Sequence, residues 1–310
     1  MFLEHLKTIA LQVSILYLIA GVGFVADKTG IFPQKSAKKV IDLLFNIILP
    51  IAIIHTFINM EYTTAHIKGL FIAFVCAAAT HLFGILAATV FFRKKYSSLE
   101  KGIYRYATVL SNAAFLALPL AQSVIGNEGV FYCAVYVGMF NIIAFTYGIH
   151  EISGHQAKID LKKIILNPGS ISVLIGVPLF LLQIKLPYII DYPMQLVCGI
   201  NSPLAMIFFG TFLANANFKN IIIKKELYFI SFLRLILIPL CMMGLFRLCG
   251  VHGDLLVAMT ISSSAPTATN TAMYAAKYDN DAALGSEIAA QSSVLSIITM
   301  PIIVAIASIL

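Results

Sequence analysis

Residues 111–119 read SNAAFLALP and residues 262–270 read SSSAPTATN, and these two stretches decide the fold. Each interrupts an apolar run that would otherwise cross a membrane as an unbroken helix. Proline removes a backbone donor and clashes with the preceding turn, and backbone groups freed in hydrocarbon need other partners. The first stretch lies in the fourth apolar run of the chain's first half, and the second lies in the fourth run of its second half. Interrupted helices at corresponding positions of two halves indicate the midplane binding site of a transporter.

The composition excludes an ordinary soluble protein. Sixty per cent of the residues are hydrophobic and only 11% are charged, whereas soluble domains carry about 25% charged residues. The net charge of +7 does not indicate nucleic-acid binding, because the basic residues lie in short loops between apolar runs. The five cysteines show no CxxC or Cys/His ligand spacing, so we expect neither a metal site nor a cofactor.

Ten apolar runs are long enough to span the hydrocarbon core as helices. They predict an all-α membrane protein whose spans cover residues 8–26, 39–60, 67–92, 102–124, 129–150, 166–185, 193–215, 226–249, 253–276 and 282–309.

The basic residues predict the orientation of these spans. Sixteen of the 21 Lys and Arg residues fall in the loops that follow the odd-numbered spans, including Lys28, Lys94, Lys95, Lys158 and Lys277. Cytoplasmic loops carry an excess of Lys and Arg. We therefore expect a multi-pass protein of the bacterial cytoplasmic membrane with both termini outside.

The two halves of the chain share faint similarities in a common order. Residues 49–54 (LPIAII) resemble residues 202–207 (SPLAMI), and each fourth span carries its interruption before a short polar hairpin. These features predict two inverted five-helix repeats, residues 1–150 and 166–310, joined by a cytoplasmic linker of residues 151–165. The alternative is a pair of proline kinks with Ser and Thr side chains joining helices, but matched positions and high polar density favour a binding site.

The candidate substrate-binding residues lie at the two interruptions. Helix N-termini present unpaired N–H groups and a partial positive charge, which suit an anion. Polar side chains at the same places are able to hold carboxylate oxygens or satisfy the freed backbone. The assigned set is Ser111, Asn112, Ala113, Pro119, Ser264, Pro266, Thr267, Asn270 and Thr271.

Three ionisable residues inside the spans are candidates for charge recognition or coupling. Arg234 lies nine residues past Lys225, roughly 13 Å deep at the helical rise. It is expected either to attract an anionic substrate, or to pair with Glu287, or to tie helices together through carbonyl groups. Glu287 is a candidate proton carrier or an interfacial charge. His81 is a candidate titrating group or a hydrogen-bonded packing residue.

At the two interruptions the chain resembles the auxin efflux carrier family, which includes malate-permease-like bacterial members and the plant PIN-type exporters. The matching stretches are residues 111–120 (SNAAFLALPL) and 265–271 (APTATNT). Asn112 and Pro119 match the first interrupted helix of the family, and Pro266 and Asn270 match the second. Ala114 and Ala117 depart from the family's glycines, and the central cytoplasmic loop is far shorter than in plant members.

The resemblance implies crossed, broken spans 4 and 9, a scaffold of spans 1, 2, 6 and 7, and a mobile transport domain of spans 3–5 and 8–10. It implies elevator-type secondary transport of a small organic anion such as malate, and a homodimer formed through the scaffold. The coupling ion is expected to be H⁺ or Na⁺, and the surroundings are the lipid bilayer.

Three alternatives remain beside a proton-linked or potential-driven carrier. A sodium-coupled symporter of the bile-acid type would share the crossed-helix plan and use Gln291, Ser292 and Ser293. A channel would need a filter motif, and an intramembrane enzyme would need a motif such as HExxH or GxSxG. Neither kind of motif is present in the sequence, so we expect a transporter and not an enzyme.

Overall fold

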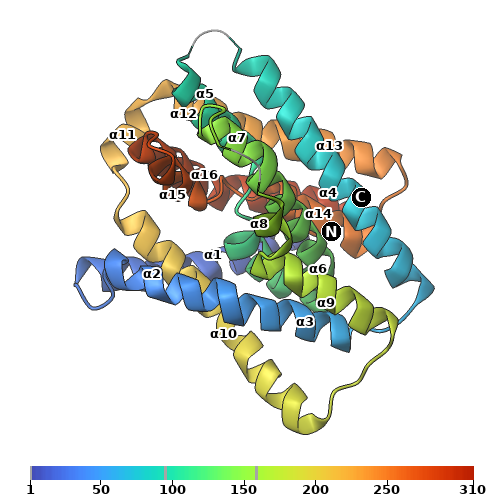
Figure 1. The fold of residues 1–310 in the computed structure, drawn as a ribbon. Helices are drawn as coiled ribbons and strands as arrows, with labels where there is room; N and C mark the ends of the chain where they lie inside the picture. The colour runs from blue at the N-terminus through green and yellow to red at the C-terminus, as the bar shows by residue number, and fades with distance from the viewer. Residues whose placement is uncertain (1, 94–95, 158–159) are drawn as a thin grey trace.

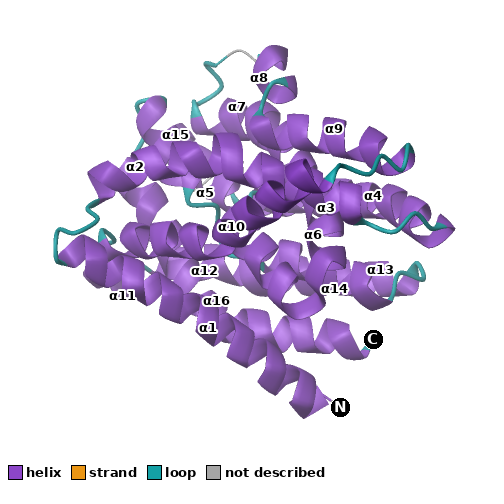
Figure 2. Ribbon diagram, turned by 90° about the horizontal axis from the view of Figure 1, so that it is seen from below, coloured by secondary structure: helices purple, strands orange, loops and turns teal. Residues whose placement is uncertain are grey.

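The computed structural model describes residues 2–93, 96–157 and 160–310, apart from the side chains of Lys35, Lys38, Leu161 and Phe218. The described residues form helices and connecting loops, without a β-strand (Figures 1 and 2). Lys94, Lys95 and Lys158, which the charge analysis assigns to loops, lie outside the described residues.

The helices follow one another through the whole chain, and four of them contain a π-helical turn, written η. In order they are α1 (Phe2–Lys28), α2 (Gln34–Leu43), η1 (Leu44–Ile48), α3 (Leu49–Asn59), α4 (Thr64–Phe91), α5 (Ser98–Val109), η2 (Ala113–Ala117), α6 (Leu118–Ile143), η3 (Ala144–Gly148), α7 (Ile149–Ile152), α8 (Leu161–Ile165), α9 (Pro168–Leu181), α10 (Tyr188–Ala214), α11 (Phe218–Ile223), α12 (Lys225–Phe232), η4 (Leu233–Leu237), α13 (Ile238–Leu248), α14 (Gly253–Ser264), α15 (Asn270–Lys277) and α16 (Ala282–Ile309).

Seven of the described helices are long and apolar enough to cross a membrane. They are Phe2–Lys28, Lys39–Asn59, Thr64–Phe91, Ala113–Ile152, Tyr188–Ala214, Lys225–Leu248 and Ala282–Ile309. The multi-pass, all-helical prediction is therefore confirmed, while the count of ten spans stays a prediction.

The difference between seven and ten has a structural origin. Predicted spans 4 and 9 are broken. The piece of span 4 before its break, α5, and both pieces of span 9, α14 and α15, have 12 residues or fewer. The second piece of span 4 runs on into span 5 as Ala113–Ile152, with non-helical backbone at Ile125 and Gly126. Predicted span 6 contains α9, which has only 14 residues.

Two groups of helices pack within the molecule. One group contains α1, α3, α9 and α10, and the other contains α4 to α7 and α12 to α16. The two groups meet where α1 packs against α16 and where α6 packs against α9. The N- and C-termini lie close together in both views (Figures 1 and 2).

Glycines allow α1 and α10 to touch through their backbones. A Cβ atom at Gly23 would collide with the carbonyl of Ile207, and one at Gly210 would collide with the carbonyl of Ala20. Only a residue without a side chain permits so close an approach. This contact joins the two long helices of the first group.

Local sequence explains several helix starts. Ser97 and Glu100 form a reciprocal capping box at the start of α5, and these hydrogen bonds hold the pKa of Glu100 below its ordinary value. Asp281 accepts from the backbone N–H of Leu284 at the start of α16. Such caps satisfy amides that have no partner within the helix.

Candidate functional site

The two interruptions lie against each other in the interior. Between α5 and η2 the chain is non-helical at residues 110–112, and between α14 and α15 it is non-helical at residues 265–269. The two segments run antiparallel and pair through a bridge between Ser111 and Thr267. The N–H of Asn112 donates to the carbonyl of Pro266 at 2.7 Å, and the N–H of Ala268 donates to the carbonyl of Leu110 at 3.0 Å. Backbone groups freed by one break are thus satisfied by the other.

The two breaks have different local causes. Ala265 is extended, with φ −61° and ψ 145°, because the residue before a proline avoids the helical region. Pro119, by contrast, lies inside the helical run, at the second position of α6. The sequence argument places the first interruption within residues 111–119 and attributes it to proline; the structure has the non-helical segment at residues 110–112, with the π-turn η2 between it and Pro119.

Arg234 holds the two half-helices that end at this crossing. Its Nε donates to the carbonyl of Ala265 at 3.1 Å, and its Nη2 donates to that of Ser263 at 2.7 Å. Its Nη1 lies 3.3 Å from the carbonyl oxygens of both Thr108 and Val109. The side chain is fully buried. A cation suits this place because the C-terminal ends of helices carry partial negative charge.

Two buried donors at the crossing have no hydrogen-bond partner among the described residues. Ser111 and Asn112 are buried, and neither Ser111 Oγ nor Asn112 Nδ2 makes a hydrogen bond to a described residue. Buried donors are almost always hydrogen-bonded in folded proteins. Both side chains belong to the segment that leads into the half-helix beginning at Ala113.

The remaining candidate residues are brought to the same region, mostly with their side chains engaged. Thr267 Oγ1 donates to the carbonyl of Ala107 at 3.0 Å. Asn270 Oδ1 accepts from the hydroxyl of Tyr106 at 3.1 Å. The hydroxyls of Ser264 and Thr271 donate to the carbonyls of Ile261 and Ala268. The bond from Tyr106 uses the amide oxygen of Asn270 and not its amide nitrogen.

Glu287 lies away from Arg234. Its carboxylate takes a hydrogen bond from Asn220 and forms an ion pair with Lys224, each at 2.5 Å. Of the three possibilities for Arg234, the geometry therefore fits the tie through carbonyl groups and not the pair with Glu287. His81 is fully buried in α4, with Nδ1 2.7 Å from the carbonyl of Ala77.

Gln291 and Ser292, named for a sodium site, are engaged with protein groups. Gln291 accepts from Ser231 at 3.1 Å and donates to the carbonyl of Ile221 at 2.6 Å. Ser292 Oγ accepts the N–H of Thr267 at 3.1 Å.

A cavity of about 390 Å³ opens between α3, α6 and α10. Its polar lining includes His55, Gln122, Gln195, Cys198 and Asn201. We call this space the vestibule. It reaches Leu118 of α6, the residue directly after η2, so it runs beside the half-helix that starts at the crossing.

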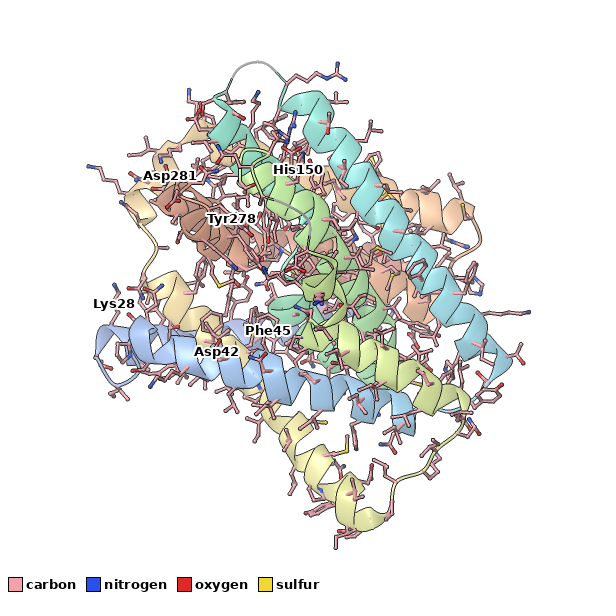
Figure 3. All side chains as sticks on the ribbon, viewed as in Figure 1. Lys28, Asp42, Phe45, His150, Tyr278 and Asp281 are labelled. Carbon is pink, nitrogen blue, oxygen red and sulfur yellow. The ribbon has the colours of Figure 1, made fainter. Side chains whose placement is uncertain are left out.

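Three aromatic rings pack together close to residues that line the vestibule. Phe115 of η2 packs on Phe45 with ring centroids 4.7 Å apart, and on Phe208 of α10 with centroids 5.3 Å apart. Phe45 lies one turn before Leu49, and Phe115 one turn before Leu118, both of which line the cavity. Phe45 is directed toward the centre of the molecule (Figure 3).

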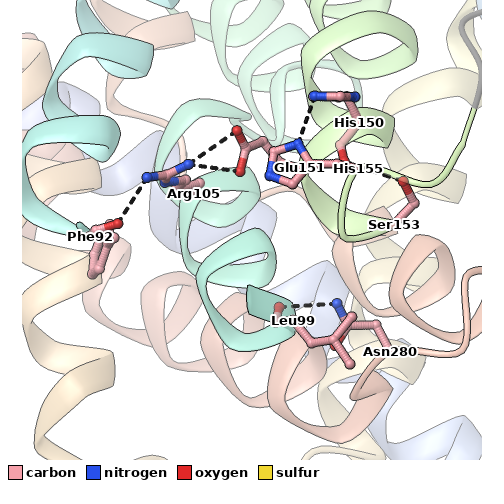
Figure 4. Close-up of polar contacts among 8 residues, drawn as sticks. All are labelled: Phe92, Leu99, Arg105, His150, Glu151, Ser153, His155 and Asn280. Carbon is pink, nitrogen blue, oxygen red and sulfur yellow. Dashed lines mark hydrogen bonds and ion pairs between the residues drawn. The ribbon is translucent and has the colours of Figure 1, made fainter. Parts of the chain in front are cut away.

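A polar cluster joins α5, α7 and the loop before α16 (Figure 4). Arg105 binds Glu151 at 3.1 Å and donates to the carbonyl of Phe92 at 3.0 Å. Asn280 donates to the carbonyls of Leu99 and Ile152. These contacts tie the first piece of one broken helix to the hairpin that follows the other.

The residue pattern alone does not reveal Tyr106 as part of this region, whereas Phe115 lies within the first interruption and Ser292 is expected there only as a sodium ligand. A tyrosine inside an apolar span is a common packing residue. The nearest available signal is that Tyr106 lies in the predicted span that carries the first interruption.

Comparison with known proteins agrees with a transport role. A family model described as a membrane transport protein matches residues 8–164 and 155–304. A protein of Methanothermobacter thermautotrophicus, named an uncharacterized transporter, is 24% identical over 293 residues, which are 93% of this chain and 95% of that protein.

Proposed function

The chain belongs to the membrane transport protein family, the auxin efflux carrier family that its sequence resembles, and on this basis we propose that it is a secondary active carrier of a small organic anion. The anion is a carboxylate such as malate. The carrier lies in the bacterial cytoplasmic membrane with both termini outside, and it acts as a homodimer.

The unpartnered donors of Ser111 and Asn112 carry the proposal. A carboxylate accepts several hydrogen bonds at once. It would take one from each of these side chains and one from the amide nitrogen of Asn270. First-turn amides of the half-helices that begin at Ala113 and Asn270 would add favourable dipoles. A neutral polar site of this kind binds an anion without a dedicated cation.

The two packed groups of helices support an elevator-type mechanism. The group of α1, α3, α9 and α10 would be the scaffold, and the second group, which contains the crossing, would move the anion across the membrane. The vestibule lies between α3 and α10 of the first group and α6 of the second. It would lead the anion from the outside to the crossing.

The test is uptake of labelled organic acids, including malate, into proteoliposomes with and without pH and sodium gradients. Replacing Asn112 by Ala should abolish uptake, and Asn112→Asp should do the same because it places a negative charge at the carboxylate. Asn46→Ala is the matched control, since the Asn46 amide donates to the carbonyl of Asp42 in its own helix.

Full uptake by both Asn112→Ala and Asn270→Ala would remove this site. Accumulation driven by a sodium gradient alone would favour the bile-acid type of symporter. Passive flux without saturation would favour a channel.

A further inference from the structure

His81 is a buried base with one free ring nitrogen. Its Nδ1 lies 2.7 Å from the carbonyl of Ala77. A carbonyl only accepts, so Nδ1 carries a hydrogen, and in the neutral ring Nε2 is then an acceptor. Nε2 is buried and makes no hydrogen bond to a described residue. A packing histidine normally has both nitrogens satisfied, so this atom needs an explanation.

The groups that face His81 are few. The ring of Tyr136, on α6, packs against it with centroids 4.9 Å apart. The Tyr136 hydroxyl lies beside Arg234 but makes no hydrogen bond of normal geometry to a described residue. Arg234, on η4, is the charged group within electrostatic range of His81.

The described residues that the other helices packed on α4 place near this point are apolar. One turn along, at Gly84, α5 and α13 present Val109 and Ile238. The acidic residue of α14, Asp254, lies in the first turn of that helix, far from the crossing.

Arg234 has no carboxylate beside it in the described structure. The buried carboxylates of the described structure are Glu151, which pairs with Arg105, and Glu287, which pairs with Lys224. Four carbonyl oxygens lie around the guanidinium, but a proton on His81 would add a second positive charge close by. In a medium of low dielectric constant, two such charges repel strongly unless an anion lies near them.

The crossing is where that anion would bind. Arg234 holds the carbonyls of Val109, which directly precedes the first non-helical segment, and of Ala265, which begins the second. A carboxylate bound at Ser111 and Asn112 would therefore lie beside the segment whose preceding carbonyl, that of Val109, contacts the guanidinium. It would offset the charge that a proton brings to His81.

We propose that His81 is the proton-binding site of this carrier, and that it loads a proton together with the substrate anion. The inference rests on the proposed function and names its coupling ion. The proton comes from water on the side to which the site is open and binds to the lone pair of Nε2. The hydrogen on Nδ1 stays on the carbonyl of Ala77. Anion and proton then cross in the same direction.

Thermodynamic linkage sets the size of the effect. If the anion favours the proton, the proton favours the anion by the same factor. One proton taken up per anion raises the apparent affinity for the anion up to about tenfold for each pH unit of acidification. Without a proton site at position 81 this dependence disappears.

The experiment uses the whole protein in proteoliposomes, with labelled malate, succinate and acetate as probes. His81→Asn keeps a donor for the carbonyl of Ala77 but has no basic nitrogen, and His81→Gln serves if the first variant fails to fold. His66→Asn is the control, because His66 lies in the first turn of the same helix, bonded to the carbonyl of Glu61.

We expect acid outside to stimulate uptake by the wild type and by His66→Asn. His81→Asn should lose this stimulation and still exchange labelled for unlabelled probe. Acid stimulation equal to that of the wild type in His81→Asn and His81→Gln would overturn the proton site alone, as would probe transport by the wild type without any dependence on pH. Transport of no probe by the wild type would overturn the proposed function, and this inference with it.

Discussion

At the scale of single residues, Arg234 shows how one side chain holds a broken membrane helix together. The guanidinium is a planar fork of donors, and here it meets four carbonyl oxygens that come from the ends of two half-helices. In hydrocarbon these carbonyls have no water to bond. Arg234 therefore replaces the helical hydrogen bonds that the two breaks remove.

Replacing Arg234 by Met should destabilise the protein by roughly 3 kcal/mol or more, since each buried acceptor left without a donor costs roughly 1–3 kcal/mol. Arg234→Lys should recover only part of the loss, because an ammonium group does not span four acceptors. The measurement is the thermal unfolding of the detergent-solubilised protein. Arg247→Met is the control, since Arg247 is exposed in the last turn of α13.

A different result would assign Arg234 another role. If Arg234→Gln melts at the temperature of the wild type but binds anions more weakly, Arg234 contacts the substrate directly. The sequence alone leaves these two roles open.

At the scale of helices, proline has two distinct effects in this chain. Three of the four π-turns, η1, η2 and η4, end two residues before a proline, at Pro50, Pro119 and Pro239. A proline ring clashes with the carbonyl of the preceding turn, and a widened turn relieves that clash. Pro266 instead lies where the helix stops. Pro178, Pro203 and Pro301 lie inside α-helices with neither feature. The surroundings of a proline therefore decide whether the span keeps its α-helix, widens to a π-turn or breaks.

The contact between α1 and α10 depends on two glycines. Gly23→Ala and Gly210→Ala should each destabilise the protein by roughly 1–3 kcal/mol, as overpacking of a close contact does. Each added methyl group meets a backbone carbonyl, which is unable to move aside without parting the helices.

Gly21→Ala is the matched control, because a Cβ atom there meets nothing within 4 Å. The free energy of unfolding of the three variants is the measurement. Equal values for Gly21→Ala and Gly23→Ala would mean that the two helices do not touch through their backbones.

At the scale of the whole molecule, the vestibule and the three phenylalanines fit a conformation in which the proposed site is reached from one side of the membrane. The cavity lies near the ends of α3 and α10 that the charge pattern assigns to the outside, and Phe45, Phe115 and Phe208 pack on one another between the helices beyond it. Phe115 belongs to the proposed transport domain and the other two rings to the proposed scaffold. Movement between the domains would separate these rings.

Cys198 gives a direct measurement of this access, because it lines the vestibule and is partly exposed. A membrane-impermeant maleimide added outside should modify Cys198 and inhibit uptake, since the adduct fills the cavity. Cys198→Ser should transport normally and resist the reagent. Modification of Cys198 only from the cytoplasmic side would contradict the proposed orientation.

The sequence by itself determined that this protein is helical and embedded in a membrane, and it singled out the two interrupted helices as the candidate binding site. The length of an apolar run, the charge of a loop and the missing N–H of proline are local properties, so the sequence alone reveals them. The same reasoning brought residues 111–119 and 262–270 forward as one candidate site.

Only the tertiary structure decided which groups meet there. Four features involve residues that are far apart in the chain. They are the pairing of Ser111 with Thr267, the carbonyl partners of Arg234, the ion pair of Glu287 with Lys224 and the position of the first break. Their physical reason is the same in each case. A polar group buried in an apolar interior takes whichever partner the packing of distant helices brings within reach, and that choice has no local signature.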